Sequence, residues 1–158
     1  MRAHNRAMAT DARHAFILFA HGARDAKWAQ ALHVLCDEVR ARRAQSHVGL
    51  AFLEFQTPSL EDALGAAVAA GCTCIDIAPV FWSSGGHVAN DVPPLLETFR
   101  LSHPRIELAL LPVLSELPGM MDFIAAVLDN LAAPPRVSFT SPSPSRGKTS
   151  ARRHAAAR

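Results

Sequence analysis

The stretch CIDIAPVFWSSGGHVANDVPP, residues 74–94, ends an apolar run with two glycines and a histidine. Nearly every residue from 74 to 82 is apolar, which is typical of a strand buried on both faces of a sheet. Gly85 and Gly86 let the backbone bend sharply and come close to a flat ligand. His87 follows directly, and a merely structural turn does not require an imidazole. The stretch therefore indicates a buried strand that opens into a functional loop.

Four such apolar runs alternate with helical patterns along the chain. The predicted strands are residues 16–20, 48–55, 73–81 and 106–114. Strands that alternate with helices form a parallel sheet covered on both faces. We therefore predict the α/β class, with an open parallel four-stranded sheet, helices on both faces and flavodoxin-like layering. Ligands of such sheets bind at the carboxyl ends of the strands, near a switch in strand order.

Capping residues predict where the first two helices begin and end. Asp25 is a suitable cap for the first helix. The second helix is expected to start at Thr57 or Ser59, with Pro58 in its first turn. Gly71 is its expected stop signal.

The last two helices are predicted from prolines and apolar periodicity. Asp91 is the expected cap of the third helix, whose first turn would hold Pro93 and Pro94 and which would end near Ser102. Pro118 is expected to open the fourth helix, which would end near Leu131. Its expected core residues are Phe123, Ile124, Val127 and Leu128.

Charge separates the chain into three parts. Residues 14–133 carry a formal charge of −6, residues 134–158 carry +6, and the first 13 residues carry +2. The segment 134–158 is rich in Pro, Ser, Arg and Ala, so we predict disordered tails at 1–14 and 134–158 around a domain at 15–133. The acidic domain argues against nucleic-acid binding.

The expected location is the cytoplasm. No apolar run approaches the roughly 20 residues that span a bilayer, and the N-terminus lacks the apolar middle of a secretory signal. An odd count of cysteines, Cys36, Cys72 and Cys74, argues against a disulfide framework. Cys72 and Cys74 lack a second cysteine pair for a thiolate site, so we interpret them as buried structural residues.

Three polar residues fall at predicted strand ends. His21 follows the first strand, Glu54 lies near the end of the second, and His87 lies in the loop after the third. Histidine and carboxylate ligands suit a divalent transition metal, and imidazole also moves protons near neutral pH. The alternatives are a turn-capping role for His21 and a solvent-facing or ion-paired Glu54. The other histidines are expected at the surface, at positions 4, 14, 33, 47, 103 and 154.

Gly85-Gly86-His87-Val88-x-x-Asp91-Val92-Pro93 resembles the signature of the small sirohydrochlorin chelatases, the cobalt- and iron-inserting branch of the class II chelatases. FILFAHGARD (16–25) and AFLEFQTPSLEDAL (51–64) resemble the family's first two strand regions. The resemblance spans about residues 15–132. One departure is Ala23, where the family usually has serine.

The resemblance implies a chelatase-like fold and insertion of a divalent metal into sirohydrochlorin, in cobalamin or siroheme biosynthesis. The family's active-site histidines fall on His21 and His87, and a carboxylate used by some members falls on Glu54. The metal would be Co²⁺ or Fe²⁺, with Ni²⁺ as a further candidate, bound as substrate and not as a permanent cofactor. Short members are expected to be homodimers, and neither nucleic acid nor membrane is an expected partner.

Substrate contacts are expected around the same edge. Sirohydrochlorin carries eight carboxylates, so an acidic domain needs local cations such as Arg24 and Lys27 to hold it. Gly85, Gly86 and Trp82 are the other candidate contacts, and Phe81 would either pack on the macrocycle or belong to the core.

Other function classes use the same residues differently. A non-catalytic metal carrier would bind metal through His21, Glu54 and His87 without binding a tetrapyrrole. A metal-dependent hydrolase would need a general base beyond these ligands. A regulatory flavodoxin-like domain would show neither activity.

Overall fold

The sheet has the predicted class and a single switch in strand order. The computed structural model describes residues 13–83 and 85–131. Strands β1 (His14–Ala20), β2 (His47–Phe52), β3 (Cys74–Pro79) and β4 (Glu107–Leu110) form one parallel sheet in the order β2-β1-β3-β4. The chain moves from β1 to β2 on one side and then returns past β1 to β3. The switch point therefore lies between the carboxyl ends of β1 and β3.

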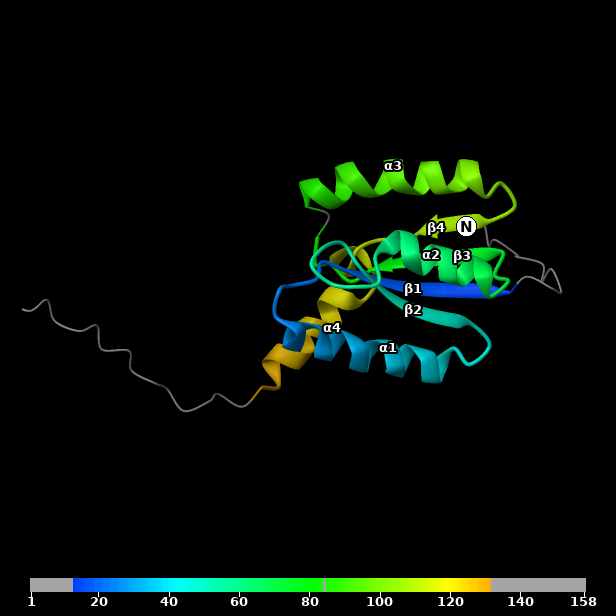
Figure 1. The fold of residues 1–158 in the computed structure, drawn as a ribbon. Helices are drawn as coiled ribbons and strands as arrows, with labels where there is room; N and C mark the ends of the chain where they lie inside the picture. Colours follow the sequence, from blue (N-terminus) through cyan, green and yellow to red (C-terminus); the bar gives the residue numbers. More distant parts are fainter. Residues whose placement is uncertain (1–12, 84, 132–158) are drawn as a thin grey trace, which may run out of the picture.

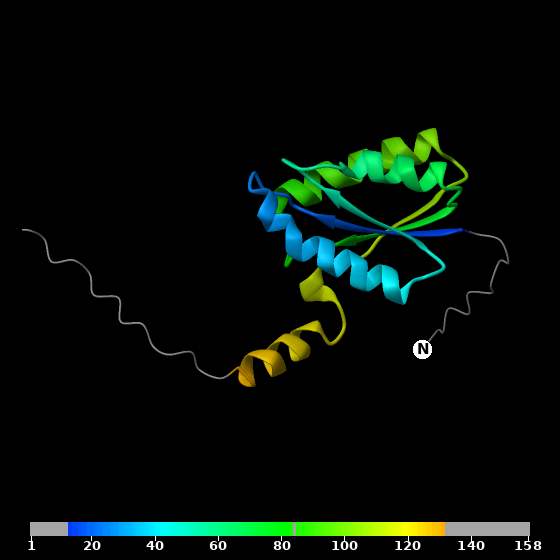
Figure 2. The ribbon, with the colours of Figure 1, turned by 60° about the horizontal axis from the view of Figure 1, so that its bottom comes forward.

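Helices cover both faces of the sheet, as the sequence predicts (Figures 1 and 2). The turn η1 (Ala26–Ala29) leads into α1 (Gln30–Arg42), which packs on one face. The helices α2 (Leu60–Ala69) and α3 (Gly86–Ser102) pack on the other. Right-handed crossover connections require this division, because the first crossover runs in the opposite direction from the next two.

Successive side chains of β1 point to opposite faces of the sheet, so the core consists of two clusters, one on each face. Ala15, Ile17 and Phe19 point to the side of α2 and α3, where they pack with buried residues of those helices. Phe16 and Leu18 point to the side of α1. Both sets are almost fully buried, and β1 is one of the two inner strands, so its carboxyl end is firmly positioned.

The domain begins earlier than predicted. His14, assigned to a disordered tail, is the first residue of β1, and the carbonyl oxygen of Arg13 accepts a hydrogen bond from the amide of Thr73. This extra pairing with the start of β3 explains the longer strand. The rest of the predicted tails, residues 1–12 and 134–158, lies outside the described residues, which end at 131.

The start of α2 differs from the prediction at Pro58. Ser59 is the N-cap, and its hydroxyl accepts a hydrogen bond from the amide of Asp62 while the Asp62 carboxylate accepts one from the amide of Ser59. Pro58 precedes this capping box and follows a cis peptide bond. Gly71 follows the helix with φ 79°, as expected of a stop residue.

The prediction that Asp91 caps α3 was wrong. The helix begins at Gly86, with Gly85 as its N-cap, and Pro93 and Pro94 lie inside it. Each proline removes one backbone hydrogen bond from a helix. Burial of Val92 on the sheet offsets that loss, and burial of Phe99 further along holds the rest of the helix.

The prediction that the last helix supplies core residues was also wrong. The helix α4 (Met120–Asp129) follows the turn η2 (Leu114–Glu116) and extends away from the sheet (Figure 2). Phe123 and Leu128 are 63% and 61% exposed. Periodicity shows which face of a helix is apolar, but not what covers that face. Among the described helices, none combines the length and apolarity needed to span a bilayer.

Two histidines expected at the surface are half-buried. His14 pairs with Asp76 across β1 and β3, with 2.9 Å between Nε2 and Oδ2. His103 follows α3, and its ring stacks on Phe99 with centroids 4.2 Å apart. Neither pairing is apparent from local sequence, since each depends on the strand register or on the end of a helix.

Candidate active site

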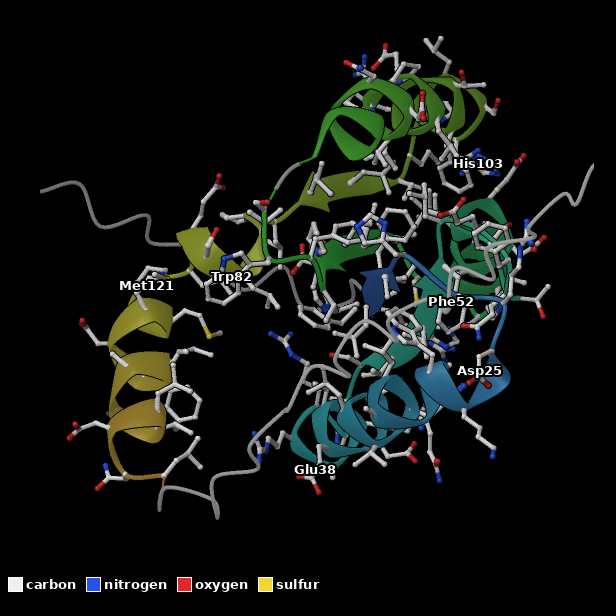
Figure 3. The ribbon with its side chains drawn as sticks, turned by 90° about the vertical axis from the view of Figure 1, so that its left-hand side faces the viewer. Asp25, Glu38, Phe52, Trp82, His103 and Met121 are labelled. Carbon is white, nitrogen blue, oxygen red and sulfur yellow. The ribbon has the colours of Figure 1, made fainter. Side chains whose placement is uncertain are left out.

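A pocket of about 330 Å³ lies at the carboxyl edge of the sheet, next to the switch point. It is lined by His21, Leu53, Glu54 and Asp91. Figure 3 views this edge end-on, with Trp82 on the side of α4 and Asp25 at the start of η1. His21 follows β1 directly and Glu54 lies two residues beyond β2, so the expected proximity of these two residues is present.

Backbone pairing continues past the strand ends and holds His21 beside Glu54. The amide of Leu53 donates to the carbonyl of Ala20, and the amide of Glu54 donates to the carbonyl of His21. Gly22 then turns the chain with φ 89°, and a Cβ at this position would lie 2.0 Å from the carbonyl oxygen of Glu54. Only glycine allows this close approach.

The ring of Phe81 packs against the imidazole of His21 on the side of the core. The two ring centroids are 4.3 Å apart, and Phe81 is 2% exposed. Of the two roles considered for Phe81, the structure shows the core role. The His21 side chain is exposed, so one side of its ring rests on the core while the other faces the pocket.

Two exposed aromatic side chains, Phe55 and Trp82, follow the carboxyl ends of β2 and β3 and are not among the lining residues of this pocket. Phe55 is 57% exposed and has φ 61°, while the amide of Gln56 donates to the carbonyl of Glu54 across it. This is a γ-turn arrangement, uncommon for a bulky residue. The guanidinium of Arg24 lies 5.2 Å from the Phe55 ring centroid. Trp82, three residues beyond the end of β3, is 51% exposed.

The structure places His87 on a helix and not in a loop. It is the second residue of α3, one helical turn before Asp91, and Gly86 is the first residue. Residues four apart occupy the same face of a helix. Asp91 lines the pocket, whereas the side chain of His87 lies outside the described part, so its role in the site stays a prediction.

The sequence matches one known protein family over most of its length. Residues 15–131 match the CbiX family model. The chain belongs to the CbiX family. The resemblance to small sirohydrochlorin chelatases is therefore confirmed at the level of the family.

Curated relatives of this CbiX chain have low sequence identity to it and align with only part of its length. It is 30% identical over 89 residues to a sirohydrochlorin cobaltochelatase of Methanocaldococcus jannaschii, covering 56% of this chain and 62% of the relative. It is 28% identical over 80 residues to a protein of the same name from Methanosarcina acetivorans, covering 51% and 62%. The chain thus spans less than two thirds of these relatives.

Solved structures share the fold. A cobalamin biosynthesis CbiX protein from Marinobacter aquaeolei aligns with TM-score 0.64 and 26% identity, covering 73% of this chain and 94% of that one. The chelatase SirB from Bacillus subtilis subspecies spizizenii, in complex with cobalt, aligns with TM-score 0.54 and 26% identity, covering 63% and 43%. SirB from Bacillus subtilis with Fe³⁺, at 20% identity and TM-score 0.65, supports the fold alone.

The pocket of this CbiX chain combines one imidazole with two carboxylates. Such a set suits a divalent first-row metal, and all three groups also exchange protons. Sequence reasoning identified His21 and Glu54 but interpreted Asp91 as a helix cap and placed Phe55 in a strand. The i, i+4 spacing of His87 and Asp91 was the available signal for Asp91, and it becomes visible only once α3 is known to begin at Gly86.

Proposed function

We propose that this chain inserts a divalent metal ion into sirohydrochlorin. The observation that carries the proposal is the pocket at the switch point, where His21 and Glu54 meet Asp91 in a CbiX-family fold. The curated relatives named above are sirohydrochlorin cobaltochelatases, which supports this substrate.

Insertion exchanges two protons for one metal ion. The ion must shed its water ligands, and two pyrrole N–H groups must release protons. In the proposed mechanism, His21 and the Glu54 carboxylate replace water on the incoming ion. His87 completes the metal site, and either imidazole would accept a pyrrole proton as it releases the ion to the macrocycle. Asp91 enters the proposal as a further carboxylate ligand or as an acceptor that passes a proton to solvent.

In the proposal, the macrocycle lies over the exposed aromatic side chains at this edge of the sheet. Trp82 and Phe55 offer flat apolar surfaces, and Arg24 supplies a cation near Phe55 for the peripheral carboxylates. Gly85, exposed before α3, leaves space for close approach. Gly86 and Lys27 stay in the proposal as further contacts.

Cobalt and iron are both proposed as substrate metals, with nickel as a further candidate, because imidazole and carboxylate ligands do not select among them by affinity order alone. No permanent cofactor is part of this mechanism. The proposed location is the cytoplasm, since none of the three cysteines is in a disulfide, as is usual in reducing compartments.

We also propose a homodimer that covers α4. Its exposed apolar side chains include Met121, Phe123, Val127 and Leu128. This chain covers 43% of the cobalt-bound SirB chain, so two copies would supply a comparable length. Sedimentation of the purified chain should give twice the monomer mass, and Phe123→Glu with Leu128→Glu should give the monomer. A monomeric parent chain would contradict this arrangement.

Anaerobic absorption spectroscopy with sirohydrochlorin and Co²⁺, Fe²⁺ or Ni²⁺ tests the enzymatic proposal. We expect accelerated conversion over a no-protein control, lost in His21→Ala and His87→Ala. The matched control is His47→Ala, which removes an exposed histidine at the opposite end of the sheet. Metal binding by a folded chain without conversion would instead support the metal-carrier alternative.

A further inference from the structure

Three side chains with different ligand atoms meet at the amino-terminal edge of the sheet, the end opposite the candidate active site. His14 is the first residue of β1 and is in register with Cys74, the first residue of β3. Asp76 follows two residues later. Residues two apart on a strand share a face, so all three belong to the face covered by α1.

The ligand atoms are already gathered. His14 Nε2 lies 2.9 Å from Asp76 Oδ2, and one ligand atom from each of the three residues lies within 4.8 Å of the others. In a tetrahedral site with metal–ligand distances near 2.0–2.3 Å, ligand atoms are separated by roughly 3.3–3.6 Å. Rotamer adjustments of a few tenths of an ångström to about an ångström would reach that geometry.

The burial of these residues suits a bound ion. The side chains of His14 and Asp76 are 24% and 21% exposed, and Cys74 is 6% exposed. An ion could therefore enter from solvent on one side and be shielded on the other. The carboxylate and thiolate would supply negative charge, and the imidazole a neutral donor.

The metal ligands proposed here do not include Cys72, although it lies two residues before Cys74. Cys72 packs in the core on the side of α2, and burial raises the pKa of its thiol. Glu107 of β4 is in register with Cys74 and is therefore on the same sheet face, but it is not one of the three residues whose ligand atoms are gathered. His47 is in register with Ala15 and belongs to the other face.

We propose that His14, Cys74 and Asp76 form a second metal site, which binds Zn²⁺ or Co²⁺ and clamps β1 to β3. Imidazole, thiolate and carboxylate are all ligands of these ions. His14 and His21 are seven residues apart along β1, about 23 Å at roughly 3.3 Å per residue. The two sites therefore cannot share an ion, and this one is structural in the proposal.

Titration of the chelator-treated full chain with Co²⁺ tests the site, because a thiolate–Co²⁺ bond absorbs in the near ultraviolet. The candidate active site has no thiol among its lining residues, so this band reports only a cysteine ligand. We expect the band in the parent chain and in His21→Ala. We expect the band to be lost in Cys74→Ala. We expect Co²⁺ to bind at least tenfold more weakly to His14→Gln and to Asp76→Asn, whose new side chain has nearly the shape of aspartate.

Cys72→Ala is the matched control and should keep the band. Zn²⁺ should displace Co²⁺ and raise the unfolding midpoint of the parent chain but not of Asp76→Asn. A parent chain without the band, or a band that persists in Cys74→Ala, would overturn the proposal. His21→Ala leaves this second site intact. A failure of the second-site proposal is therefore distinguishable from a failure of the proposed insertion activity.

Discussion

The imidazole of His21 rests on the ring of Phe81, with the ring planes tilted by 59°. Phe81 in turn meets Phe19 of β1 edge-to-face, with centroids 5.3 Å apart. The exposed histidine of the candidate site is therefore positioned by a stack that reaches into the core. A side chain fixed in this way loses little rotamer freedom when it binds an ion or accepts a proton.

Phe81→Leu tests this positioning. We expect about 1–2 kcal/mol of lost stability from the smaller side chain. We also expect kcat/KM for insertion to fall by about tenfold, since the imidazole loses its support. Phe99→Leu is the control, because it removes the same volume from the same core cluster without touching His21. Equal kcat/KM values for the two variants, measured by absorption, would contradict a positioning role.

Gly22→Ala should separate His21 from Glu54. The new Cβ would lie 2.0 Å from the Glu54 carbonyl oxygen, and φ 89° is strained for alanine. The two loops must move apart, so we expect lower stability in chemical denaturation and loss of most insertion activity. Gly65→Ala is the control: it lies in α2 with nothing within 4 Å of an added Cβ. It should gain about 0.5–1 kcal/mol and keep full activity.

The fold was predictable because it depends on local patterns. Apolar runs mark the α/β repeat, and the Asp25 carboxylate accepts a hydrogen bond from the amide of Lys27, although it caps the turn η1 and Ala29 is the N-cap of α1 itself. The carboxyl-edge rule then places His21 near Glu54. These inferences need only periodicity and chain direction.

The remaining features depend on tertiary pairing. Asp91 enters the pocket because α3 begins at Gly86, which prolines inside the helix conceal. The pairing of His14 with Asp76 depends on the register between β1 and β3. The exposure of α4 depends on what lies beside it. No single-segment pattern carries that information.

Asp91→Asn is expected to reduce insertion while leaving the fold intact. Asp91 is exposed and lines the pocket, so the substitution removes one charge without a change of volume. A carboxylate that binds the ion should show as a raised apparent KM for Co²⁺, whereas one that relays protons should lower kcat and shift the pH profile. Asp122→Asn, in α4, is the charge-matched control. An unchanged rate at every pH would remove Asp91 from the mechanism.

The capping box of α2 should make stability depend on pH, because it anchors the loop that begins at Glu54. Hydrogen bonds from the hydroxyl and the amide of Ser59 hold the pKa of Asp62 below its ordinary value. A lowered folded-state pKa means that Asp62 stabilises the fold above its unfolded pKa, near 3.9. That contribution is lost as the pH falls through the lowered folded-state value.

Asp62→Asn should therefore unfold at a lower denaturant concentration than the parent chain at pH 7, and the difference should shrink as the pH falls below about 4. Glu61→Gln is the control, since it removes a charge from the same helical turn and keeps the capping box. Denaturation midpoints of the three proteins between pH 3 and 7 provide the measurement. A difference between Asp62→Asn and the parent chain that stays constant over this range would show that the Asp62 charge does not act through the cap.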